Sequence, residues 1–273
     1  MPLTVADSAF LRQLVRTRSG IVLGEDKGYL LESRLVPLAK AIGLAGLEEL
    51  TVRLKAEPSG QLSRQVVEAM TTNETFFFRD IHPFECLKKL VMPDLVAKRG
   101  TAKRLDMWCA AASTGQEPYT IAMTLREYFP QLASWTTRFI ATDIATDILK
   151  RAREGRYSQL EVNRGLPAPL LIKHFTKDGL DWKVKDELKR MIEFKELNLL
   201  DTYTINGQLD VIFIRNVLIY FDVETKKAIL GKCRKLLRTD GYLFLGGAET
   251  TLNIDDAFVR VEFDRGGCYR LKG

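Results

Sequence analysis

The chain has few of the residues that build metal centres or disulfide frameworks. Among 273 residues there are two His and four Cys, and the cysteines form no Cys-x-x-Cys pair. This argues against a metal site and predicts free thiols in a reducing compartment. No apolar run approaches the roughly 20 residues of a membrane span, and the N-terminus lacks the features of a signal peptide. We therefore expect a cytoplasmic protein that is not inserted in a membrane.

The charge is mildly basic, with 41 Lys and Arg against 35 Asp and Glu. An acidic partner and a solvated surface with a small excess of Lys and Arg both explain a net charge of +6, and both readings stay open. No block of basic residues is interleaved with aromatic ones, so we expect no nucleic-acid groove. Nothing in the composition demands more than a monomer.

The most informative segment is an apolar strand from Leu105 that runs into the small-residue turn 110–115, before a helix opens at Glu117-Pro118. Doubly wound α/β domains build nucleotide pockets in this way, because small residues let the backbone approach a ligand. There is no Gly-x-Gly-x-x-Gly, and Glu117 would repel a phosphate at the helix N-terminus. A cationic nucleoside without phosphate fits best, and S-adenosylmethionine is the common one.

Hydrophobic periodicity predicts an all-α N-terminal domain over residues 1–72, with helices near 5–20, 27–42, 47–55 and 62–70. From Arg104 onward strand and helix signals alternate, which predicts a doubly wound, Rossmann-like domain over residues 73–273. The strands fit 105–109, 138–143, 192–197, 209–214, 242–245 and 268–271, and the helices fit 118–128, 146–154 and 223–237. The gap before Ile192 is too long for one crossover and predicts a small antiparallel β insert at about 157–191.

Several polar residues follow the predicted strands. Asp143 is placed to accept ribose hydroxyls, and we prefer this to a helix N-cap, which would suit Thr146 better. Asn198-Leu199 would hold an adenine edge and face, or would simply form a turn. Arg215 follows a buried apolar run, where a cation is costly unless an anion meets it. The aromatic triplet 76–78 favours packing between the domains over a ligand cage.

The chain resembles the CheR family of bacterial chemotaxis receptor glutamate methyltransferases. Five motifs carry the resemblance in order: Thr-Asn-Glu-Thr-x-Phe-x-Arg from Thr72, Ser-Thr-Gly-Gln-Glu-Pro-Tyr, Ala-Thr-Asp-Ile, Asn-Leu-Leu and Arg-Asn-Val-Leu-Ile-Tyr-Phe-Asp. The resemblance implies S-adenosylmethionine binding by Asn73, Thr75, Arg79, Glu117, Asp143, Asn198, Leu199, Ile214 and Arg215. It also implies that Arg79, Arg215 and Tyr220 lie nearest the methyl transfer.

The resemblance further implies a protein-glutamate O-methyltransferase that acts on the cytoplasmic helices of methyl-accepting chemotaxis receptors. The basic residues of the first two predicted helices would either dock those receptor helices or form a solvated surface; they are Arg12, Arg16, Lys27, Arg34 and Lys40. The insert has a short turn and many lysines, so we expect no tight binding of a receptor C-terminal pentapeptide. The competing hypotheses are a nucleic-acid or small-molecule methyltransferase on the same scaffold, and a non-enzymatic module that senses the cofactor.

Overall fold

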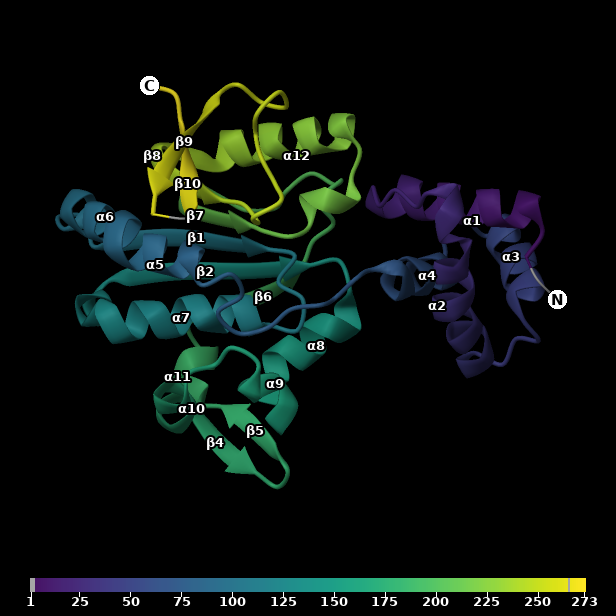
Figure 1. Cartoon of the computed structure of the whole chain (residues 1–273), viewed down its shortest axis with the longest axis horizontal. Helices are drawn as coiled ribbons and strands as arrows, with labels where there is room; N and C mark the ends of the chain where they lie inside the picture. Colours follow the sequence, from purple (N-terminus) through teal and green to yellow (C-terminus); the bar gives the residue numbers. More distant parts are fainter. Residues whose placement is uncertain (1–2, 265) are drawn as a thin grey trace. The chain divides into compact units, whose positions relative to one another are not determined.

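The structure, a computed structural model, describes residues 3–264 and 266–273 (Figure 1). The chain divides into two compact units. The first runs to Thr72 and includes Asn198–Thr202 and Tyr220–Thr225, and the second comprises Asn73–Leu197, Tyr203–Ile219 and the chain from Lys226 onward. Across the described ranges, every helix is too short or too polar to pass through a lipid bilayer.

The first unit is helical, and the four predicted helices are confirmed. They are α1 (Val5–Ser19), α2 (Gly28–Ala41), α3 (Leu47–Ala56) and α4 (Gln61–Met70), with a short 3-10 turn η1 (Glu25–Lys27) before α2. Thr4 caps α1, because its hydroxyl accepts the Asp7 N–H at 3.1 Å. The leucines that recur at helical spacing are fully buried and form the core, among them Leu11, Leu31, Leu35, Leu50 and Leu54.

Two segments distant in sequence complete this helical unit. Gly20 ends α1 with a φ of +80°, and a Cβ at Gly20 would lie 3.0 Å from Leu200 and 3.2 Å from Phe221. A side chain at this position would therefore strain the backbone and press on its neighbours. Arg16 forms an ion pair with Asp222 at 2.7 Å. The unit is thus built from three stretches of sequence.

The second unit contains a seven-stranded sheet in the order β6-β2-β1-β7-β8-β10-β9. β6, β2, β1, β7 and β8 are parallel to one another, and β10 runs antiparallel to both of its neighbours, β8 and β9. Figure 1 shows α7 and α8 on one face and α12 on the other, which confirms a doubly wound fold. The strands are β1 (Arg104–Ala110), β2 (Thr136–Asp143), β6 (Glu193–Glu196), β7 (Leu209–Ile214), β8 (Leu237–Phe244), β9 (Phe258–Phe263) and β10 (Gly266–Leu271).

The helices that cover the sheet are α7 (Gln116–Tyr128), α8 (Thr146–Glu154) and α12 (Val223–Leu236). Before β1 the chain forms α5 (His82–Cys86), a π turn η2 (Leu87–Val91) and α6 (Met92–Arg99), while η3 (Pro130–Ser134) precedes β2 and η4 (Leu218–Tyr220) follows β7. The sequence patterns do not predict α5, α6 or β9. Every residue of β1 after Arg104 is buried, as expected for a central strand covered on both faces.

The predicted β insert is confirmed as an antiparallel sheet in the order β3-β5-β4. It comprises β3 (Arg156–Tyr157), α9 (Gln159–Asn163), α10 (Ala168–His174), β4 (Phe175–Asp178), β5 (Asp181–Val184) and α11 (Asp186–Lys189). The Phe77 ring lies 5.1 Å from Tyr157 and 5.7 Å from Phe175, with edge-to-face geometry. The prediction that the aromatic triplet packs between domains is therefore wrong for Phe77, which packs inside the second unit against the insert.

Candidate active site

The turn after β1 brings strained backbone and small residues together at the carboxyl edge of the sheet. Ala111, Ser113 and Gly115 have φ values of +51°, +49° and +96°. A Cβ at Gly115 would lie 3.0 Å from the Tyr157 hydroxyl, so only glycine fits without displacing the insert. The Ser113 hydroxyl donates to the Asn73 carbonyl at 2.8 Å. Positive φ at residues other than glycine is rare and clusters at functional sites.

Asp143 ends β2 and is tied into this turn. One carboxylate oxygen accepts the Ser113 N–H at 2.8 Å, and the other accepts the Ala145 N–H at 3.0 Å. The side chain is buried. An ionised carboxylate has about four acceptor positions, which suits Asp143 to the ribose hydroxyls predicted from the sequence. Thr146 is the first residue of α8, and the N-cap is Ala145, which has no side-chain cap.

Arg215 leaves the end of β7 and forms the most strongly charged contact of the site. Its guanidinium donates to the Glu117 carboxylate, and it also donates to the Asp80 carboxylate at 2.8 Å. A third bond reaches the Arg79 carbonyl at 3.1 Å. The Arg215 side chain is fully buried. The anion that a buried arginine requires is therefore supplied by the chain itself, from α7 and from the turn after Arg79.

The Nε of Arg215 is also buried, and no residue in the described ranges accepts its hydrogen. On the other side of Glu117, the Cys109 thiol lies 3.4 Å from the second carboxylate oxygen. Burial raises the pKa of the Cys109 thiol well above its usual range, and the Glu117 carboxylate adds to this effect. Cys109 therefore stays a neutral thiol that donates to Glu117.

Asn73, Thr75 and Arg79 lie on the segment that precedes α5, and the structure brings this segment to the turn after β1. The Asn73 carbonyl accepts from Ser113, and Thr75 is partly buried. Arg79 donates to the Glu74 carbonyl at 2.9 Å and lies over the Phe76 ring at 5.7 Å. Phe78, Asp80 and Ile81 surround Arg79 with positive φ values of +53°, +67° and +36°.

Asn198, Leu199 and Tyr220 belong to the loop segments of the first unit. The Asn198 amide donates to the Arg18 carbonyl at 2.7 Å, and its oxygen accepts the Leu200 N–H at 3.0 Å. These bonds are typical of a turn asparagine, and the adenine contact of Asn198 stays a prediction. Leu199 is buried, and the Tyr220 carbonyl accepts the Val22 N–H at 2.9 Å. Ile214 is fully buried at the end of β7, in the second unit.

Sequence reasoning missed two carboxylates of this region, Asp80 and Glu249. Asp80 follows directly on the Arg79 motif, but nothing in the sequence indicated that it meets Arg215. Glu249 accepts hydrogen bonds from the backbone N–H groups of Asn216, Val217 and Leu218. A signal for Glu249 was present, because the pattern of a strand, small residues and a glutamate that singled out Glu117 recurs at Gly246-Gly-Ala-Glu249.

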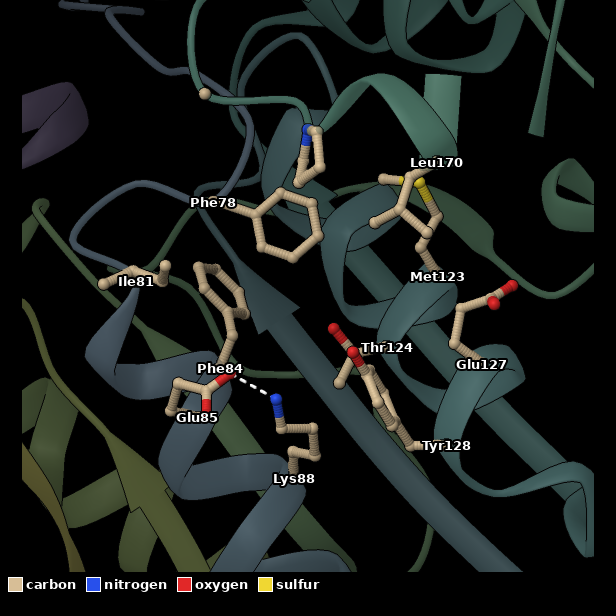
Figure 2. Close-up of a pocket in the computed structure, with 12 residues that line it drawn as sticks. Phe78, Ile81, Phe84, Glu85, Lys88, Met123, Thr124, Glu127, Tyr128 and Leu170 are labelled. Atoms are coloured by element: carbon tan, nitrogen blue, oxygen red, sulfur yellow. Dashed lines mark hydrogen bonds and ion pairs between the residues drawn. The ribbon is translucent and has the colours of Figure 1, made fainter. Parts of the chain in front are cut away.

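A separate cavity of about 160 Å³ lies between α5 and the C-terminal half of α7 (Figure 2). Its walls include Phe78, Phe84 and Met123, and an ion pair between Glu85 and Lys88 lies at its side. None of the site residues predicted from the sequence lines it. In residues 3–264 and 266–273, no three His, Cys, Asp or Glu side chains are grouped to hold a metal ion.

Two family models match the chain. The model described as "CheR methyltransferase, SAM binding domain" matches residues 73–266, and the one described as "CheR methyltransferase, all-alpha domain" matches residues 6–71. The chain belongs to the CheR methyltransferase family. The resemblance drawn from the five sequence motifs is therefore confirmed.

This CheR chain is similar over nearly its whole length to proteins named chemotaxis protein methyltransferases. It is 41% identical to "Chemotaxis protein methyltransferase Cher2" of Pseudomonas putida over 96% of each chain. It is also 41% identical to "Chemotaxis protein methyltransferase 1" of Pseudomonas aeruginosa over 98% of each chain. The "Chemotaxis protein methyltransferase" of Vibrio parahaemolyticus is 39% identical over 99% of each chain. This CheR protein is thus a chemotaxis methyltransferase, and S-adenosylmethionine is its cofactor.

Proposed function

We propose that this enzyme methylates glutamate side chains of methyl-accepting chemotaxis receptors. The products are glutamyl methyl esters, and the reaction tunes adaptation in the cytoplasm. The observation that carries the proposal is the buried Arg215 at the carboxyl edge of the sheet, held by Glu117 and Asp80 beside Arg79. This arrangement places fixed charges of both signs where a cationic cofactor and an anionic acceptor would meet.

The site fits a phosphate-free, cationic nucleoside. Glu117 keeps 13% of its side chain exposed in the first turn of α7, where it favours a positive charge. We propose that the buried Asp143 carboxylate accepts the ribose hydroxyls, and that the Nε of Arg215, which has no acceptor among the described residues, donates to an anion. We propose that the cofactor is held by Asn73, Thr75, Arg79, Glu117, Asp143, Asn198, Leu199, Ile214 and Arg215.

Methyl transfer to a carboxylate requires little acid–base catalysis by the protein. When bound, the cofactor supplies an electrophilic methyl group on a sulfonium, and the acceptor glutamate is already ionised near neutral pH. The protein's task is then to align the acceptor carboxylate and to exclude water, and alignment alone is worth up to roughly 7–11 kcal/mol. Arg79 is the better candidate for holding the acceptor, because its guanidinium is partly exposed and makes one hydrogen bond to a carbonyl among the described residues.

Arg215 is more fully engaged than the sequence suggested, since its two terminal nitrogens bond to Glu117, Asp80 and the Arg79 carbonyl. We propose that it organises the turn around Arg79 and presents only Nε to a ligand. Tyr220 would hydrogen-bond the acceptor carboxylate. Glutamine would be rejected as an acceptor, because a neutral amide offers no charge to a guanidinium.

We propose that the helical unit docks the glutamate-rich receptor helices through exposed lysines. Arg34 is not available for this role, because it donates to the Met70 and Thr71 carbonyls at 2.7 and 2.9 Å. Arg16 is likewise engaged in an ion pair. Lys27 and Lys40 are exposed and remain the candidates. Electrostatic docking of this kind acts mainly on the association rate and weakens with salt.

We further propose that the insert does not capture a receptor C-terminal pentapeptide. The edge strand β4 has four residues, and Thr176, Lys177 and Asp178 are exposed on it. A short edge strand that carries a lysine is a poor template for strand addition. Receptor recognition is then left to the helical unit and the active site, and the enzyme acts as a monomer.

The test is incubation of the protein with methyl-labelled S-adenosylmethionine and receptor-containing membranes. Base-labile carboxyl methyl esters should appear on the receptor, and receptors whose acceptor glutamates are replaced by alanine should not be labelled. Truncating the receptor's C-terminal pentapeptide should leave the labelling rate unchanged. Label in nucleic acid, or none in receptor, would refute the proposed substrate.

A further inference from the structure

The loop that follows β7 is folded around one carboxylate, that of Glu249. One oxygen accepts the N–H groups of Asn216 at 2.8 Å and Gly246 at 2.6 Å. The other accepts the N–H groups of Val217 at 2.9 Å and Leu218 at 2.7 Å. An ionised carboxylate has about four acceptor positions, and here four backbone donors fill them.

The backbone of this loop is shaped for an anion. Asn216 has a φ of +58°, which turns three successive N–H groups of the loop toward the same point and forms an anion-binding nest. Gly246 is required on the opposite side, because a Cβ there would lie 2.7 Å from a Glu249 oxygen and 2.8 Å from the Asn216 backbone nitrogen. The nest and the Glu249 carboxylate therefore fit together only with a glycine at position 246.

The nest begins at the residue after Arg215. The direction in which Arg215 leaves β7, toward Glu117 and Asp80, therefore depends on the backbone that Glu249 holds. We propose that Glu249 is a positioning residue for methyl transfer, which acts through Arg215 and touches neither cofactor nor acceptor. This inference rests on the function proposed above.

The informative variant is Glu249→Gln, which keeps the size of the side chain. Its amide nitrogen is a donor, so it faces backbone N–H groups that lose their acceptor. We expect kcat to fall about tenfold or more, since misalignment of a positioning group acts on the reaction step. Glu249→Asp, which keeps the charge, should recover part of the rate. Glu262→Gln, at an exposed position on β9, is the matched control and should leave kcat unchanged.

The double variant separates positioning from a general structural effect. If Glu249 acts through Arg215, adding Glu249→Gln to Arg215→Ala should lower kcat by no more than about twofold further. A merely structural role would multiply the two losses. The inference is overturned if the losses multiply or if Glu249→Gln keeps wild-type kcat.

Amide hydrogen exchange of the protein without ligand provides a readout that does not need activity. The amides of Asn216, Val217, Leu218 and Gly246 should exchange at least about tenfold faster in Glu249→Gln, while those of β1 keep their protection. Unchanged exchange at these four amides overturns the inference even if turnover falls. If the wild type fails to label receptors while the amides respond as expected, the proposed substrate is wrong and the positioning of the loop stands.

Discussion

Replacing Asp143 by alanine should weaken both the cofactor site and the fold around it. The substitution removes the acceptor of two buried backbone donors, the N–H groups of Ser113 and Ala145. An orphaned buried donor costs about 1–3 kcal/mol, and some relaxation of the turn limits the total to about 2–4 kcal/mol. For a protein of this size we expect the midpoint of thermal unfolding to fall by roughly 4–16 °C.

The same substitution should reduce affinity for S-adenosylhomocysteine. Loss of two charge-assisted hydrogen bonds to ribose hydroxyls is worth about 3 kcal/mol, which is a hundredfold or more in the dissociation constant. Calorimetric titration measures this directly, at a temperature well below the unfolding midpoint of the variant. Asp143→Asn keeps one acceptor oxygen for one of the two backbone donors, so it should unfold between the wild type and Asp143→Ala.

Asp147→Ala is the matched control, because Asp147 lies on the following helix with 78% of its side chain exposed. It should change neither the unfolding midpoint nor the affinity. A dissociation constant for Asp143→Ala equal to that of the wild type would refute the ribose assignment. A wild-type unfolding midpoint would refute the role of the carboxylate in holding the turn.

Three further predictions concern other parts of the chain. Tyr220→Phe should lower kcat with receptor and leave S-adenosylhomocysteine affinity unchanged, and equal turnover would contradict a hydrogen bond to the acceptor. Burial lowers the pKa of His174 below 6.5, although its partner Glu127 pulls it upward. As the pH falls, the unfolded chain therefore binds the proton before the folded chain does. The contribution of His174 to stability is complete above about pH 6.5 and is lost as the pH falls below it. Thermal unfolding midpoints should show this loss in the wild type and a smaller loss in His174→Gln. Reversing the charges of Lys27 and Lys40 should raise KM for receptor and make KM less dependent on salt concentration. Unchanged kinetics across a salt series would show that these lysines only form a solvated surface.

Central strands of the second unit could be predicted from the sequence because they are buried on both faces and appear as apolar runs that a single aspartate interrupts. The runs 105–109 and 209–214 lie within β1 and β7. The edge strand β9 alternates apolar and polar residues from Phe258 to Phe263, so its signal was present but weaker. The segment 82–99 was missed because Pro83 and Pro93 interrupt its periodicity, and in the structure it is divided by a π turn.

Less of the candidate site than of the fold could be predicted from the sequence. Glu117 stood out as a carboxylate in the first turn of a helix, and Arg215 stood out because it follows a buried apolar run. The structure pairs them. Asp80 and Glu249 did not stand out, because their roles depend on left-handed backbone at Asp80 and Asn216, which brings together groups far apart in sequence. The sequence placed Arg34 among the basic residues that would dock a receptor, and only the structure reveals that its guanidinium donates to main-chain carbonyls.

The helical unit includes two loops that are synthesised long after its helices. Its last segment ends at Thr225, about 150 residues after Thr72, so the unit cannot be completed while only its helices have left the ribosome. At 5–20 residues per second the wait is roughly 8–30 s. For that interval the surface around Gly20 lacks Leu200 and Phe221. A chimera that exchanges the N-terminal helices between two family members must therefore carry the two loops with them, and a fragment cut at residue 72 should be less stable than the same helices within the full chain.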